Sequence, residues 1–169
     1  LLPGGSTVPV FLSCRRLFSQ PKYRSKIEAA LTETIEESYP SADLIVGVAT
    51  AGIGWAHAVA SALNMPMAYV RSGKKGYGVG GLVEGDPSEG SNAVVIDDVL
   101  FSGKSVFGAS EALMEEKKIT TAGYVGIAAL NGEGVSEYTQ RGLQAAVLTD
   151  YQELIASALL HSHITAEEA

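Results

Sequence analysis

The chain has 169 residues, of which 46% are hydrophobic and 18% are charged, and its formal net charge is −7. This length suits one domain with a sizeable core, and the acidic balance argues against a general binder of nucleic acid or of anionic membranes. A single cysteine, Cys14, excludes a disulfide framework and a cysteine-cluster metal site. No apolar run is long enough to span a bilayer, and no segment has the pattern of a signal peptide. We therefore expect a cytoplasmic protein with neither a nucleic-acid nor a membrane partner.

Helical and extended patterns alternate along the chain. In order, the sequence predicts a helix over 25–38, a strand over 44–49, a helix over 55–63, a strand over 67–71, a strand over 93–97, a helix over 105–117, strands over 124–129 and 145–148, and a last helix over 150–160. The run 44–49 is apolar throughout, which is typical of a strand buried on both faces. Asp150 stands in an N-cap position before the last helix. Strands that alternate with helices at this spacing predict an α/β fold with a parallel sheet.

Two glycine-containing motifs resemble nucleotide-binding signatures but fail their requirements. Residues 76–81 satisfy G-x-G-x-x-G, yet no strand runs into them and no helix starts from them, so a mobile glycine-rich loop is the better interpretation. The Gly-Lys-Ser at 103–105 ends like a P-loop, but Asp98 stands where that motif requires glycine. What remains is a strand ending at Asp97–Asp98, a short polar loop and a helix N-terminus. Backbone N–H groups there, together with Lys104, suit a phosphate.

Three polar segments follow predicted strands, at the edge where open α/β sheets place their ligands. They are the small-residue turn at 50–54, the cations Arg71, Lys74 and Lys75, and the run from Asp97 to Ser105. Between residues 44 and 83 the sequence has no Asp or Glu, so these cations produce a local positive field in an acidic protein. Such a field suits a polyphosphate substrate.

The paired carboxylates Asp97 and Asp98 need a different partner, because they would repel a phosphate. Ribose hydroxyls and a metal-bound ligand both meet that requirement, with Mg²⁺ as the metal. A 5′-phosphate on the helix N-terminus, a ribose on the aspartates and a diphosphate on the turn at Thr50 together describe phosphoribosyl diphosphate (PRPP). A receiver-domain phosphoacceptor, or a cap for the following turn, is the alternative interpretation of the pair.

The segment 94–105, VVIDDVLFSGKS, resembles the signature of type I phosphoribosyltransferases. Further segments are similar, in the same order, to those of the family members that act on orotate: an N-terminal hood at 9–21, a diphosphate-binding turn at 49–53, a catalytic loop at 69–85 and a closing segment at 148–151. The resemblance implies a single domain over 1–169 with a mostly parallel sheet flanked by helices. A hood segment at 1–24 and a mobile loop region at 72–90 belong to that expectation.

The resemblance also implies an activity and a set of roles. The reaction would be the Mg²⁺-dependent transfer of the phosphoribosyl group from PRPP to orotate in pyrimidine synthesis, by a homodimer whose loop reaches the neighbouring subunit's site. The metal would be held mainly by PRPP and water. Arg71 and Lys75 would act on the diphosphate, and Asp97 would hold a ribose hydroxyl. The remaining substrate contacts would come from Thr50, Ala51, Gly52, Lys74, Tyr77, Asp98, Ser102, Gly103, Lys104 and Ser105.

Two departures from the family pattern keep alternatives open. Phe101 stands where a Thr or Ser hydroxyl is usual, close to the position of the base, and Tyr77 replaces a loop histidine. A phosphoribosyltransferase for another base is therefore one alternative. A non-catalytic PRPP sensor is the other, although the retained Lys75 and the lack of a basic DNA-binding face speak against it.

Overall fold

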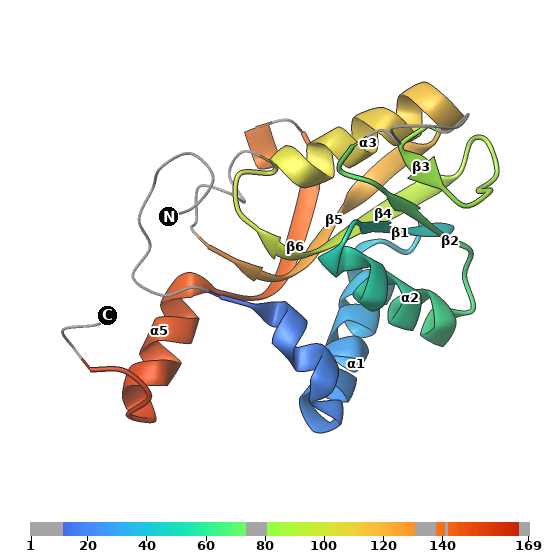
Figure 1. The fold of residues 1–169 in the computed structure, drawn as a ribbon. Helices are drawn as coiled ribbons and strands as arrows, with labels where there is room; N and C mark the ends of the chain where they lie inside the picture. Colours follow the sequence, from blue (N-terminus) through green and yellow to red (C-terminus); the bar gives the residue numbers. More distant parts are fainter. Residues whose placement is uncertain (1–11, 74–80, 131–137, 141, 166–169) are drawn as a thin grey trace.

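The computed structural model describes residues 12–73, 81–130, 138–140 and 142–165 (Figure 1). The elements are a 3-10 helix η1 (Cys14–Ser19), α1 (Pro21–Ser38), β1 (Leu44–Val48), α2 (Ala51–Leu63), β2 (Met67–Val70), β3 (Val83–Glu84), β4 (Asn92–Leu100), α3 (Lys104–Lys117), β5 (Thr120–Ala129), β6 (Gln144–Asp150) and α5 (Tyr151–Leu160).

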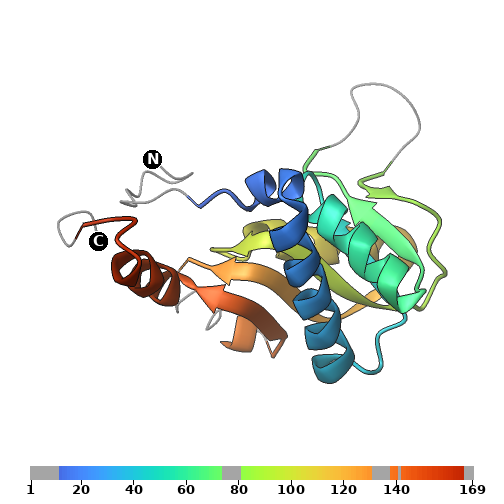
Figure 2. The same cartoon turned by 90° about the horizontal axis from the view of Figure 1, so that it is seen from below.

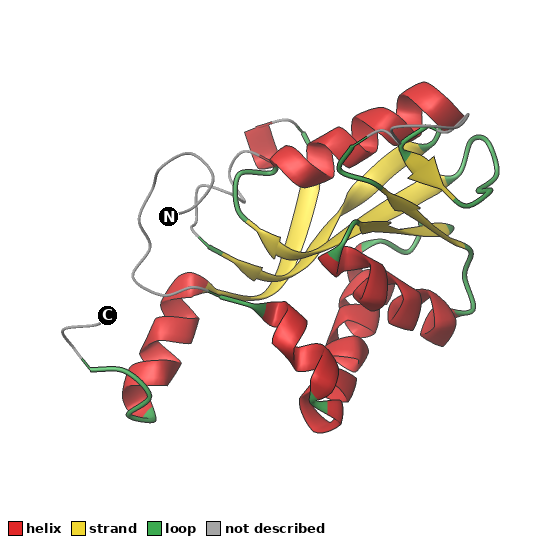
Figure 3. Ribbon diagram, viewed as in Figure 1, coloured by secondary structure: helices red, strands yellow, loops and turns green. Residues whose placement is uncertain are grey.

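The strands form one six-stranded sheet in the order β3-β2-β1-β4-β5-β6. Every neighbouring pair is parallel except β2 and β3, which are antiparallel. Helix α3 covers one face of the sheet, and α1 and α2 cover the other (Figures 1 and 3; Figure 2 shows the second face). The predicted α/β fold with a mostly parallel sheet flanked by helices is confirmed. In such a sheet the carboxyl ends of β1, β2 and β4 meet at one edge.

Each face of the sheet has its own hydrophobic core. Under α3, the strands contribute residues such as Val46 and Val95, which pack against Leu113. On the opposite face, Ile45 and Val94 pack against Trp55 of α2 and the helices around it. All five residues of β1 are buried, as the apolar run predicted. Residues of η1 join this second core through Cys14, which is 1% exposed.

Most element boundaries agree with the sequence prediction, but α2 begins at Ala51 rather than at 55, β5 begins at Thr120 rather than at 124, and β4 ends later than predicted. The prediction ended this strand at Asp97, but the ladder with β5 continues through Asp97↔Gly126 to Leu100↔Ala129. Asp98 therefore lies within the strand as well as Asp97, and the strand continues to Leu100. The last helix follows its prediction closely, because the Asp150 side chain accepts a hydrogen bond from the Glu153 N–H at 2.9 Å.

Two elements have no counterpart in the sequence prediction: the short strand β3 and the 3-10 helix η1. Helix α1 also begins earlier than predicted, because Pro21 occupies its first turn, where the fixed φ of proline suits a helix and its missing N–H is not needed. Within the described part of the chain, no helix combines the length and the apolar character that crossing a membrane requires.

Candidate functional site

A cavity of about 600 Å³ opens at the carboxyl end of β4. Its volume falls in the range of small-molecule sites, roughly 300–1,000 Å³. It is lined by the end of β4, the loop into α3, the N-terminal segment before α1, and two residues from the β5 end of the sheet: Leu12, Ser13, Arg15, Asp97, Asp98, Val99, Leu100, Phe101, Ser102, Gly103, Lys104, Ser105, Val106, Leu130 and Tyr138.

The loop before α3 is shaped for an anion. Gly103 is the N-cap of α3 and has a φ of +71°, and a side chain at this position would overlap the Phe107 ring. Glycine is therefore required both by the backbone conformation and by the packing. The first turn of α3 carries no acidic residue, and Lys104 is exposed there. Unpaired N–H groups at the helix N-terminus, with this ammonium beside them, can bind a phosphate.

The two aspartates of β4 lie in the same cavity. The Asp98 N–H donates to Asp97 Oδ1 at 2.9 Å. Burial raises the pKa of Asp97 to about 7; the backbone hydrogen bond from Asp98 opposes that rise, the negative charge of Asp98 adds to it, and the positive charge of Arg15 lowers the pKa. Asp97 is thus a carboxylate that gains from any ligand able to donate hydrogen bonds to its ionised form.

The turn after β1 packs directly against β4. A side chain at Gly52 would overlap the carbonyl oxygen of Ile96, the residue before Asp97, and one at Gly47 would lie 2.9 Å from the Gly52 oxygen. Ala51 and Gly52 are buried in the first turn of α2, Thr50 is exposed, and the Ala49–Thr50 peptide is cis. These small residues hold the helix N-terminus close to the aspartates, although the turn is not among the described residues that line the cavity.

Arg71 follows β2 at the same edge of the sheet. Its Nη1 lies 3.5 Å from Glu84 Oε1 in an ion pair between β2 and β3. That nitrogen is buried, and Glu84 is its partner in the ion pair. Like the turn at Thr50, Arg71 does not line the described cavity. Lys74, Lys75 and Tyr77 lie outside the described residues.

The structure thus brings six of the predicted site residues into one cavity: Asp97, Asp98, Ser102, Gly103, Lys104 and Ser105. It adds residues that the sequence did not single out, namely Leu12, Ser13, Arg15, Leu130 and Tyr138. Only Arg15 among these carried a usable signal, since it is a cation within the segment that resembles the family's hood. The others are apolar or uncharged positions that only the fold brings to the cavity.

The carboxylates at this edge of the sheet indicate how a metal ion could be held. Among the described residues, no group of three or more His, Cys, Asp or Glu side chains is placed to hold a metal ion. Two neighbouring carboxylates, Asp97 and Asp98, do lie in the cavity. Mg²⁺ is commonly bound through one or two carboxylates together with substrate phosphates and water. The residues present therefore fit a Mg²⁺ that arrives with a phosphorylated substrate.

Comparisons with known proteins agree with this geometry. The family model of the phosphoribosyl transferase domain matches residues 14–148. The chain is 37% identical to an orotate phosphoribosyltransferase of Levilactobacillus brevis over 169 residues, covering 99% of the chain and 80% of the relative. It is 38% identical to an orotate phosphoribosyltransferase of Listeria monocytogenes over 168 residues, covering 97% and 78%. The crystal structure of orotate phosphoribosyltransferase from Aeropyrum pernix superposes with a TM-score of 0.83 at 27% identity, covering 93% of this chain and 88% of the other.

The chain therefore belongs to the phosphoribosyltransferase family, with the type I fold. Within that family it belongs with the orotate phosphoribosyltransferases.

Proposed function

We propose that this chain transfers the phosphoribosyl group of PRPP to orotate, giving orotidine 5′-monophosphate and diphosphate in pyrimidine synthesis. The observation that carries the proposal is that one cavity is lined by the N-terminus of α3 and by two half-buried carboxylates, Asp97 and Asp98. On this proposal the 5′-phosphate lies on residues 102–105, and Asp97 and Asp98 accept hydrogen bonds from the ribose hydroxyls. The family membership supports the same assignment.

The diphosphate is assigned to the turn at Thr50 and to Arg71. Support comes from the edge of the sheet on which both lie, from the Gly52 backbone packed against β4, and from the positive charge of Arg71 at the end of β2. Mg²⁺, held mainly by PRPP and water, would neutralise the charge of the diphosphate when bound. The protein's share of the catalysis is then electrostatic, because cations that face the departing diphosphate favour charge separation at the ribose carbon.

The proposal includes a homodimer in which a loop of one subunit reaches the site of the other, and the cytoplasm as its compartment. The free, buried thiol of Cys14 suits a reducing compartment. The loop residues Lys74, Lys75 and Tyr77 would contact the substrate, with Lys75 beside the leaving group.

Lys75→Ala is expected to lower kcat by roughly 100-fold or more, because it removes a positive charge from the departing diphosphate. The loss should be measured as orotate consumption by absorbance, with PRPP and Mg²⁺. Lys26→Ala on α1, an exposed lysine far along the chain from the loop, is the matched control and should leave both kcat and the melting temperature unchanged. A Lys75→Ala enzyme that turns over at the wild-type rate would contradict the assigned role of this lysine.

The position of Phe101 favours one alternative, a phosphoribosyltransferase for another base. Its side chain lines the cavity where a hydroxyl is usual in the family. The same assay decides between the two, since purine bases can replace orotate in parallel reactions. Magnesium-dependent consumption of orotate supports the proposal, and consumption of a purine base without orotate turnover supports the alternative.

A further inference from the structure

The charges around the cavity are not all used by the proposed reaction. Among the described residues that line it, four carry a charge: Arg15, Asp97, Asp98 and Lys104. Lys104 is assigned to the 5′-phosphate, and the aspartates to the ribose. Arg15 has no substrate group assigned to it. Orotate brings one charged group that is equally unassigned, the carboxylate on its pyrimidine ring.

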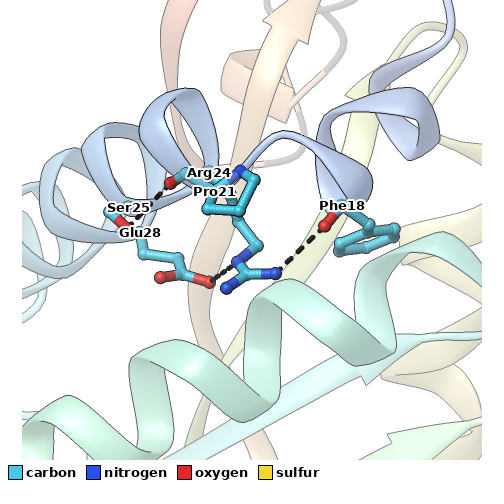
Figure 4. A network of polar contacts seen from close by, with 5 residues as sticks. All are labelled: Phe18, Pro21, Arg24, Ser25 and Glu28. Atoms are coloured by element: carbon cyan, nitrogen blue, oxygen red, sulfur yellow. Dashed lines mark hydrogen bonds and ion pairs between the residues drawn. The ribbon is translucent and has the colours of Figure 1, made fainter.

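The backbone that carries Arg15 is fixed by contacts on both sides. Before it, Cys14 is buried in the core. After it, the Phe18 ring stacks on Trp55 with 4.6 Å between ring centroids, and the Phe18 carbonyl accepts a hydrogen bond from Arg24 Nη1 at 3.0 Å (Figure 4). Arg24 is itself held by Glu28, with 3.3 Å between Nε and Oε1. Helix η1 is thus docked on α1 and α2, and it holds Arg15 at the cavity.

Arg15 and Lys104 reach the cavity from opposite faces of the sheet. Helix η1 packs into the core that contains α1 and α2, through Cys14. Helix α3, whose first residue is Lys104, packs into the other core through Val106 and Phe107. The two aspartates of β4 lie between these approaches. In a nucleotide the 5′-phosphate and the base leave the ribose at opposite ends, so a cation at each side matches a phosphate at one end and a charged base at the other.

We propose that Arg15 binds the carboxylate of the base and is the residue that selects a carboxylated pyrimidine. This inference rests on the proposed function. A guanidinium presents a planar fork of N–H donors that pairs with both oxygens of a carboxylate. The need for such a partner is sharpened by Phe101, which offers the base an apolar ring and no hydrogen bond. Arg15 lines the same cavity as Asp97, Asp98 and Phe101.

Arg15→Gln and Arg15→Lys test the proposal by comparing two ligands that differ only in the carboxylate. Orotate is measured as substrate, by its KM, and uracil as a competitive ligand, by its inhibition constant. Arg15→Gln is expected to raise the KM of orotate by about 10- to 100-fold, because the charge-assisted hydrogen bonds of the guanidinium to the carboxylate are lost. The inhibition constant of uracil and the KM of PRPP should each stay within about twofold of wild type. Arg15→Lys keeps the charge and should recover part of the loss. Arg16→Gln, the exposed neighbouring arginine that does not line the described cavity, is the control.

Two outcomes would overturn the inference while leaving the proposed function intact. Wild-type turnover of orotate with an unchanged KM in Arg15→Gln would show that Arg15 does not contact the base. A raised KM of PRPP, together with equal increases in the KM of orotate and the inhibition constant of uracil, would show that Arg15 positions the aspartates instead of binding the base carboxylate. Wild-type enzyme that consumes no orotate at all would overturn the proposed function itself, and the inference with it.

Discussion

Asp97→Asn is expected to lower turnover by at least about 100-fold and, at the same time, to raise the stability of the free protein at neutral pH. The loss of turnover follows from the position of Asp97 in the cavity. An ionised carboxylate accepts a strong hydrogen bond from a ribose hydroxyl and stabilises positive charge that develops on the ribose ring. An amide accepts a weaker hydrogen bond and stabilises that charge hardly at all.

The gain in stability follows from the pKa of Asp97, which burial raises to about 7 from 3.8. The folded state therefore binds a proton that the unfolded chain has already released between about pH 4 and pH 7. Stability from this group is present at low pH, falls as the pH rises through that window, and does not return above it. Asparagine has no charge to bury, so the variant should lack this loss.

The measurement is the melting temperature of wild type and variant at pH 5 and pH 8, without PRPP. The difference between variant and wild type should be larger at pH 8, by several degrees, at about 2–4 °C for each kcal/mol in a domain of this size. Glu36→Gln, an exposed carboxylate on α1, should show no such pH dependence. An Asp97→Asn protein that is less stable than wild type at pH 8 would contradict the burial of a charged carboxylate at this position.

The sequence predicts the core of the fold well because its strands and helices are locally unambiguous. The run 44–48 is apolar on both faces and only five residues long, which is typical of a strand between two helical layers. The inward face predicted for the helix after residue 104, formed by Val106, Ala109, Ala112 and Leu113, is buried as expected. In these segments the hydrophobic period and the tertiary environment demand the same structure.

The strand segments that the sequence did not predict form because they pair with neighbouring strands. Strand β3 has two residues and exists through its antiparallel pairing with β2, including the hydrogen bond from the Arg71 N–H to the Leu82 carbonyl at 3.0 Å. Two residues carry no period that a pattern could detect. The extension of β4 to Leu100 has the same origin, because the pairing with β5 outlasts the apolar run and carries the polar Asp97 and Asp98 into the sheet.

The residues of the candidate site also fall into two groups: those that the sequence predicts and those that only the fold brings to the cavity. Residues contiguous with the signature, from Asp97 to Ser105, were predictable because one segment supplies both the carboxylates and the phosphate loop. Arg15 comes from a distant segment, and its place at the cavity depends on Phe18 stacking on Trp55 and on Arg24 holding the Phe18 carbonyl. Such contacts join segments that are far apart in the chain, so they produce no regular spacing of residues that the sequence could show.

Gly52→Ala is expected to destabilise the protein by about 3 kcal/mol or more and to weaken PRPP binding at least tenfold. A methyl group at this position would overlap the carbonyl oxygen of Ile96, and the next nearest atoms, Ile96 C and Asp97 Cα, lie 3.2 and 3.3 Å away. All three belong to the backbone of a central strand, which cannot shift without breaking ladders on both sides. The strain must therefore move the first turn of α2 away from β4.

That movement has a functional consequence, because the turn at Thr50 is the part of the chain assigned to the diphosphate and β4 carries the aspartates assigned to the ribose. The distance between the two sets of contacts is fixed by the absence of a side chain at Gly52.

The measurement for Gly52→Ala pairs a urea melt with the Kd of PRPP by calorimetry in the presence of Mg²⁺. Gly108→Ala is the matched control: Gly108 is exposed within α3, with no described atom within 4 Å of an added methyl group, so alanine should stabilise the helix by about 0.5–1 kcal/mol and leave the Kd unchanged. If Gly52→Ala lost stability and yet bound PRPP as tightly as wild type, the diphosphate would have to be held by residues other than this turn.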